Sequence, residues 1–213
     1  MTTINSTHDN TNAIYEVHVS HTNSKLGADI PSINLPAGVT CRPDAPCRTQ
    51  GCYAMKGNWL FPTVKQSLLD NLRAYKQNPN KYFNDIAAKT TLARFVRWHS
   101  SGDIPDTVYL AGMCKVARKN KNTDYLAFTK RFEIVNDFIS AGKKIPKNLH
   151  IIFSAWENFM PENPYSFPVT YVWSKNFDNS AIPKDAIPCA GKCDHCLACW
   201  KLKKTQSVYF KKH

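Results

Sequence analysis

The chain has 213 residues, of which 43% are hydrophobic and 21% charged, and this balance is typical of one globular domain with its own core. No apolar run approaches the roughly 18 residues that span a bilayer, and the N-terminus lacks a secretory signal, so we expect a cytoplasmic protein without a membrane partner. Twenty-eight Lys and Arg against 16 Asp and Glu give a net charge of +12, which favours anionic partners such as nucleic acid, a phosphorylated small molecule or an acidic protein.

Three regions follow one another along the chain. Residues 1–12 are rich in Thr and Asn and are expected to be a disordered tail. Residues 13–187 are expected to form the folded domain, beginning with short strands at 13–20 and 32–35. Residues 188–213 hold a second group of cysteines and a basic C-terminal tail, which we expect to pack on the same domain.

The loop after the second expected strand contains Cys41, Cys47 and Cys52, spaced C-x5-C-x4-C. It also contains two prolines and a glycine and few apolar side chains, so packing alone cannot hold it. Convergence of the three thiolates on one metal centre would hold the loop in place.

Helices and strands then alternate. Apolar side chains recur at helical spacing over 63–76, and Asn78 and Asp106 precede two further helices as N-caps. A fourth helix is expected over 131–141. Strands are expected at 95–99, 125–129, 149–154, 169–173 and 208–210. This order predicts an α/β fold, a partial, open TIM-like barrel of parallel βα units, with polar residues for chemistry at the carboxyl ends of the strands.

The second cysteine group ends this pattern with the spacing C-x3-C-x2-C-x2-C. Four thiols this close suit a 4Fe-4S cluster, which takes one ligand per iron, better than zinc, which usually joins two more distant pairs. Zinc stays the rival reading, and disulfides stay an alternative for all eight cysteines. The predicted iron ligands are Cys189, Cys193, Cys196 and Cys199.

The first group has three cysteines, and Cys114 is the only thiol outside both groups. Because Cys114 lies on the apolar face of an expected helix, we predict that it is a buried packing residue. A 4Fe-4S cluster at Cys41, Cys47 and Cys52 would then keep one iron open to bind a small molecule.

Two motifs resemble the phage "gene product 88" domain family of mobile elements. The cysteine loop ends in Cys52-Tyr53-Ala54, and the strand at 95–99 runs into an Arg-x-His-x-Ser-Gly-Asp motif formed by Arg97, His99, Ser101, Gly102 and Asp103. The resemblance implies a phage protein, in the cytoplasm of its host cell, but it brings no settled activity.

The loop and the Ser-Gly-Asp turn more distantly resemble the radical S-adenosylmethionine (SAM) enzymes, although the cysteine spacing is wider and Asp stands where those enzymes have Glu. The resemblance implies a catalytic site of the three cysteines with His99 and Asp103, which would need an electron donor. It also implies that Ser101, Gly102 and Asp103 bind S-adenosylmethionine, with Tyr53 as a stacking partner. His99 and Arg97 enter this site because strand alternation predicts that they share a face.

Two other functions stay open. The chain could be a non-catalytic iron–sulfur protein of a phage or mobile element that binds nucleic acid through its basic surface. It could also use the open iron without redox chemistry, as a Lewis acid or sulfur carrier.

Overall fold

The structure, a computed structural model, describes residues 14–21 and 23–212, so the expected disordered tail lies outside the described residues. The helices are α1 (Cys47–Gln50), α2 (Pro62–Gln77), α3 (Pro79–Thr90), α4 (Thr107–Lys119), α5 (Phe132–Ser140) and α6 (Cys193–Cys196), with 3-10 turns η1 (Tyr53–Met55), η2 (Gly57–Leu60) and η3 (Ala198–Trp200). The strands are β1 (Val19–Ser20), β2 (Ser32–Ile33), β3 (Phe95–Trp98), β4 (Asp124–Thr129), β5 (Leu149–Ser154), β6 (Val169–Trp173), β7 (Ile187–Pro188) and β8 (Ser207–Lys211).

Across the described residues the strands form one sheet of eight, in the order β1-β2-β3-β4-β5-β6-β8-β7. Every pair is parallel except β1 with β2. Because neighbours in the sheet are nearly in chain order, the βα units run in one direction without crossing back. The expected α/β fold with an open, mostly parallel sheet is therefore confirmed, and the sheet is not closed.

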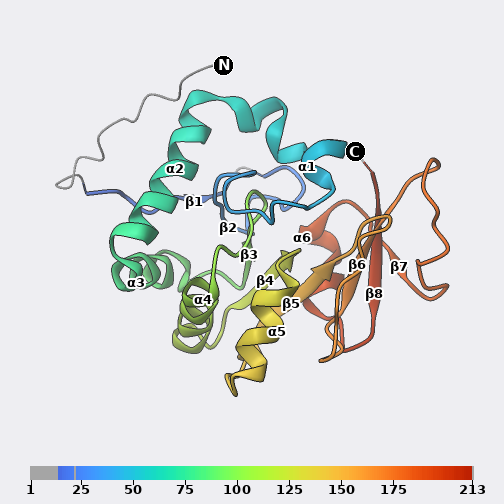
Figure 1. Ribbon diagram of the computed structural model, residues 1–213. Coiled ribbons are helices and arrows are strands. Elements are labelled where there is room, and N and C mark those ends of the chain that lie inside the picture. Colours follow the sequence, from blue (N-terminus) through green and yellow to red (C-terminus); the bar gives the residue numbers. More distant parts are fainter. Residues whose placement is uncertain (1–13, 22, 213) are drawn as a thin grey trace.

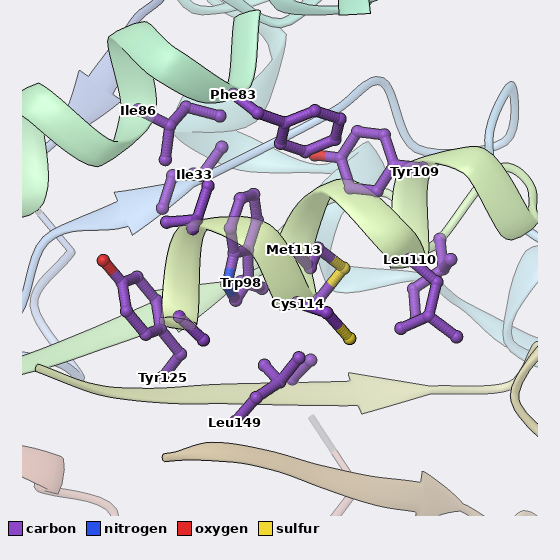
Figure 2. Packing of buried hydrophobic residues seen from close by; sticks show 14 of the residues in the cluster. Ile33, Phe83, Ile86, Trp98, Tyr109, Leu110, Met113, Cys114, Tyr125 and Leu149 are labelled. Atoms are coloured by element: carbon purple, nitrogen blue, oxygen red, sulfur yellow. The ribbon is translucent and has the colours of Figure 1, made fainter. Parts of the chain in front are cut away.

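One face of the sheet is packed under α2, α3, α4 and α5, and we call it the helix face. Figure 1 shows α3, α4 and α5 along this side of β3, β4 and β5. The alternate residues Val96 and Trp98 of β3 point into this layer, as do Tyr125 of β4 and Ile151 of β5. Figure 2 shows Trp98 beside Met113 of α4 at the centre of this core, with Tyr125 on one side and Leu110 of α4 on the other.

The opposite face, which we call the inner face, carries the other half of each strand. Leu126 of β4 and Ile152 of β5 form a small core there with Leu26, Ile30 and Trp200. These partners come from the loop before β2 and from the segment that follows α6. The inner face is therefore covered by irregular chain rather than by helices, and this arrangement leaves space for a cavity.

Most expected elements are confirmed to within two residues, and the physical signals behind them are visible. The side chains of Asn78 and Asp106 accept hydrogen bonds from the backbone N–H of Lys81 (3.0 Å) and Tyr109 (2.8 Å), as N-caps do. The strand expected over 13–20 is wrong in extent, because only Val19–Ser20 pair with β2 among its described residues. Within 14–21 and 23–212, no helix has the length and hydrophobicity needed to cross a bilayer.

Candidate functional site

A cavity of about 610 Å³ lies on the inner face, where the carboxyl ends of the strands border it. Its size is within the range of small-molecule sites, roughly 300 to 1,000 Å³. Residues from both cysteine groups line it, although they are far apart in the sequence. The lining thiols are Cys41, Cys47, Cys52, Cys189, Cys193 and Cys199.

The first group occupies the loop that leaves β2, and all three thiols are half-buried. The Cys47 thiol donates a hydrogen bond to Cys52, which lowers the pKa of Cys52 to about 6 and raises that of Cys47. Burial raises the pKa of Cys41. The Lys130 ammonium acts on all three thiols in the direction that favours thiolate. The pair of Cys47 and Cys52 thus already favours one thiolate, the form that binds a metal.

The Ser-Gly-Asp turn fixes the start of this loop. Ser101 Oγ donates to the Leu35 carbonyl (2.9 Å), and Thr40 Oγ1 accepts from the Asp103 backbone N–H (3.1 Å). Gly102 has φ +77°, and a Cβ there would lie 2.7 Å from both the Leu35 carbonyl oxygen and Thr40 Oγ1. Only glycine allows this close approach, so the turn is an anchor for the chain that leads into Cys41.

Asp103 lines the cavity but is already well bonded. Its carboxylate accepts hydrogen bonds from Thr129 Oγ1 (2.6 Å) and from the backbone N–H of Lys130 (2.9 Å) and Ile104 (2.8 Å). Burial raises its pKa, while these bonds and the Lys130 ammonium act to lower it. Asp103 therefore ties the end of β3 to the end of β4, and its role toward a ligand remains a prediction.

The far end of the cysteine loop is held by two side chains. Tyr53 donates its hydroxyl to the Ser100 carbonyl (2.5 Å). Trp156, after β5, donates its indole N–H to Gln50 Oε1 (2.6 Å). Tyr53 thus joins the cysteine loop to the residue before the Ser-Gly-Asp turn, and its role toward a cofactor stays a prediction.

The second group reaches the cavity from the opposite side. The backbone N–H of Cys193 donates to the Lys25 carbonyl (2.9 Å), and that of Cys189 donates to the Tyr209 carbonyl (2.8 Å). Burial raises the pKa of Cys193, and that of Cys199 to about 12. Cys196 is exposed and does not line the cavity. Three of the four predicted ligands therefore face the cavity, and the fourth lies at its outer side.

Arg97 is a buried cation that acts on the second group. Its guanidinium lies 4.1 Å above the Phe128 ring and donates to the carbonyls of Trp98 (2.9 Å) and His99 (3.4 Å). Burial lowers its pKa, and Tyr53, Cys193, Cys199 and Cys189 act in the opposite direction. Among the described residues no carboxylate forms an ion pair with it. An anionic metal–thiolate centre would supply the missing counter-charge.

His99 departs from its predicted position. Strand β3 ends at Trp98, and His99 has φ +57°, so the alternation that would place it beside Arg97 is broken. The ring packs on Tyr109 of α4, with 3.4 Å between His99 Nε2 and the Tyr109 hydroxyl. The predicted shared face is wrong, although His99 still borders the cavity. Burial lowers its pKa to about 3, so the ring is neutral at physiological pH.

Cys114 lies on α4 in the helix-face core, 0% exposed and outside the cavity lining. Figure 2 shows it beside Met113, with Leu149 of β5 below. Its predicted packing role is confirmed, and it cannot serve as a fourth ligand for the first group. None of the eight cysteines, all of them within the described residues, is paired in a disulfide.

The thiol arrangement can be tested against the predicted metal. Among the described residues no three Cys, His, Asp or Glu side chains meet closely enough for a single ion. Thiolates around one tetrahedral zinc lie about 3.8 Å apart, given a Zn–S bond of about 2.3 Å. In a 4Fe-4S cluster each thiolate binds a different iron and the sulfurs lie further apart. The donor set, two groups of soft thiols, fits either iron–sulfur clusters or zinc, and the choice of clusters stays a prediction.

Several residues that line the cavity could not be identified from the sequence. Lys25 lies in the loop before β2, Lys211 ends β8, and Lys212 follows it. Nothing in a strand followed by basic residues distinguishes a cavity wall from a solvated tail. Lys130 and Trp156, by contrast, follow strands β4 and β5, and the carboxyl end of a parallel strand is where such a signal is found.

Comparison with known proteins adds one finding. A family model described as "Gene product 88" matches residues 6–202, which is nearly the whole chain. No curated protein and no solved structure matches the chain. The motif-based prediction of the family is confirmed, and the resemblance to radical SAM enzymes stays a prediction.

Proposed function

The chain belongs to the gene product 88 family, and we propose that it is an iron–sulfur protein with two 4Fe-4S clusters, the first of them a catalytic site of the radical SAM type. The observation that carries this proposal is the shared cavity, which brings three thiols and a separate four-cysteine segment to the carboxyl ends of parallel strands. Because Cys114 is buried in the other core, the proposal gives the first cluster three thiol ligands, all from its own loop.

Cys41, Cys47 and Cys52 would hold the first cluster, and Cys189, Cys193, Cys196 and Cys199 the second, auxiliary one. When bound, a cluster with three protein ligands supplies an electron and an open coordination position, which radical SAM enzymes use to cleave the sulfonium of S-adenosylmethionine. We interpret the open sheet as a partial TIM-like barrel that carries this chemistry at the usual end, with the C-terminal segment as its iron–sulfur part.

The residues around the first group have definite tasks in this proposal. Asp103 lines the cavity with a carboxylate that would accept hydrogen bonds from a ligand amine, and Ser101 and Gly102 form the wall beside it. Tyr53 borders the same space and offers its ring for stacking. Lys130 favours thiolate in all three cysteines and leaves the site with a positive potential. The segment after α6 excludes water from the inner face.

The first test is metal content. Anaerobically purified protein should contain iron and sulfide, and Mössbauer spectroscopy of the first cluster should show one distinct iron site. Cys47→Ala should remove one cluster and keep the other. Cys114→Ala is the matched control and should keep both. Stoichiometric zinc in place of iron would contradict the proposal.

The second test is the cofactor. In the reduced protein, S-adenosylmethionine should change the EPR spectrum of the first cluster, and 5′-deoxyadenosine should form. Asp103→Asn should weaken the spectral change more than it lowers iron content. An unchanged spectrum in iron-loaded protein would leave a cluster protein and remove the radical SAM assignment.

The cationic lining favours one other candidate, a non-catalytic phage protein that binds nucleic acid in the cytoplasm of its host. Five lining side chains are cationic and one is a carboxylate, counting described residues only. Binding to random DNA or RNA that weakens steeply with salt, without 5′-deoxyadenosine formation, would support it. We rank it second because these cations face a cavity rather than an open surface.

A further inference from the structure

The cations of the cavity share an unusual environment. Each of four lies over an aromatic ring, and none of the four forms an ion pair with a described carboxylate. They are Lys25 over Phe210 (5.1 Å), Arg97 over Phe128 (4.1 Å), Lys130 over Trp156 (5.6 Å) and Lys212 over Trp156 (5.7 Å) and Phe177 (4.5 Å). A ring face positions a cation but leaves its charge and its N–H donors available to an anion.

These cations form two pairs that serve different parts of the cavity. Arg97 and Lys25 lie on the side of the second cysteine group, where they favour thiolate in Cys193. The rings beneath them, Phe128 and Phe210, touch each other at 5.8 Å between centroids. The negative charge of the thiolates in that group would balance Arg97 and Lys25, so this pair needs no other anion.

Lys130 and Lys212 form the other pair, and both lie over the Trp156 ring. Lys130 is partly committed, since it donates to Ser154 Oγ (2.9 Å) and acts on the first three thiols. Lys212 Nζ has no hydrogen-bond acceptor among the described residues, and its backbone is fixed by a bond from its N–H to the Trp173 carbonyl (2.8 Å). The charge of Lys212 is therefore not neutralised by any carboxylate in the described part of the chain.

We propose that Lys212, Lys130 and Trp156 form a subsite for the phosphate group of a small phosphorylated substrate, next to the first cysteine group. The inference rests on the proposed function for what happens to the substrate, but not for its binding. Both ammonium groups line the cavity and lie 5.6 and 5.7 Å from the centre of the Trp156 ring, so we assign them to one anion, and a doubly charged phosphate matches two cations better than a carboxylate does. The enclosing cavity selects a small molecule over a duplex.

Anaerobically purified, full-length protein tests the subsite by isothermal titration calorimetry with inorganic pyrophosphate, adenosine monophosphate and uncharged adenosine. Pyrophosphate and adenosine monophosphate should bind, and adenosine should bind at least tenfold more weakly. Lys212→Ala and Lys130→Met should each weaken pyrophosphate binding about tenfold or more. Lys143→Ala is the matched control, because Lys143 also lies over a ring, Phe138 at 5.2 Å, but outside the cavity. It should change binding less than twofold.

Three results would overturn the subsite: no binding of either phosphate compound, equal weakening by Lys143→Ala and Lys212→Ala, or preference for a single-stranded oligonucleotide whose binding ignores Lys212. Metal analysis of the same samples separates the two proposals. Lys212-dependent pyrophosphate binding in protein without iron would leave the subsite and remove the cluster function. Iron-loaded protein that responds to S-adenosylmethionine but binds no phosphate would do the reverse.

Discussion

The two cysteine regions are held by different forces. The first loop contributes almost nothing to a hydrophobic core and is fixed by hydrogen bonds at both ends, to the Ser-Gly-Asp turn and to Trp156. The second segment is fixed by packing, because Trp200 and its neighbours fill the inner face over Leu126 and Ile152. A loop fixed by hydrogen bonds can adjust around a ligand, whereas a packed segment cannot. The proposed function assigns an open metal site to the first region and a fully protein-ligated site to the second, and this difference in anchoring is what it requires.

The largest effect should come from the packed region. Trp200 is 4% exposed and donates its indole N–H to the Asp124 carbonyl (3.1 Å). Trp200→Ala should lower the free energy of unfolding by about 3–5 kcal/mol and release the iron of the second group first. Urea unfolding and metal analysis measure both changes. Trp173→Ala, at a site 36% exposed, is the control and should cost about 1 kcal/mol or less. Equal losses would show that the segment is not anchored by packing.

The hydrogen-bonded region should be most sensitive at Gly102. Gly102→Ala adds a left-handed residue and a contact with the Leu35 carbonyl, which together should cost about 2–4 kcal/mol. Gly142 has φ +75°, but no neighbouring atom lies within 4 Å of the position that a Cβ would take, so Gly142→Ala carries the backbone cost alone, about 1–2 kcal/mol. Comparing the thermal unfolding of the two variants separates the steric part of the Gly102→Ala cost from its backbone part. Indistinguishable losses would contradict the close fit of the turn to the loop.

A pH effect should arise at the junction of the two regions. In the folded chain the pKa of His99 is about 3, whereas the pKa of an unfolded histidine is near 6.5. The unfolded state binds more protons below pH 6.5, so stability falls with decreasing pH, by about 2 kcal/mol at pH 5 from this residue. Urea unfolding across pH 5–7.5 should show a shallower dependence for His99→Phe. The exposed His195 gives the control, His195→Ala, which should follow the wild type.

The smallest effect should be a change in reduction potential that separates the two proposed clusters. Removing the charge in Arg97→Met should disfavour the reduced second cluster by about tenfold, a shift of about 59 mV to more negative potential. Arg97→Lys keeps the charge and should restore most of the value. Redox titration followed by EPR measures the shift. If the first cluster moved as much as the second, Arg97 would not belong to one region.

The fold was predictable because its signals are local. The helices at 62–77 and 107–119 have strong apolar periodicity and capped or proline-marked starts, and β5 is a near-continuous apolar run, largely buried and interrupted by His150. The short strand β7 and the helix α6 carried no such signal, because two to four residues cannot show a period. Their structure depends on contacts with β8 and with the loop around Lys25.

The candidate site was predictable in composition but not in layout. Cysteine spacing and strand ends indicated the first thiols and Asp103. The meeting of the two cysteine groups in one cavity depends on which face the C-terminal segment covers, and alternation within strands does not tell the two faces apart. His99 shows the limit most directly, since its left-handed backbone breaks the alternation with Arg97 and packs the ring on Tyr109, although His99 still borders the cavity.

The position of the second cysteine segment also sets an order of events during synthesis. Strands β2 to β6 and the first three cysteines leave the ribosome before residues 193–200, which cover the inner face. Until those residues arrive, Leu126 and Ile152 are in contact with Leu26 and Ile30 but lack the cover of Trp200, so the cavity beside the first loop is open on that side. Under the proposed function, iron would have a window to reach the first loop before the chain closes over it.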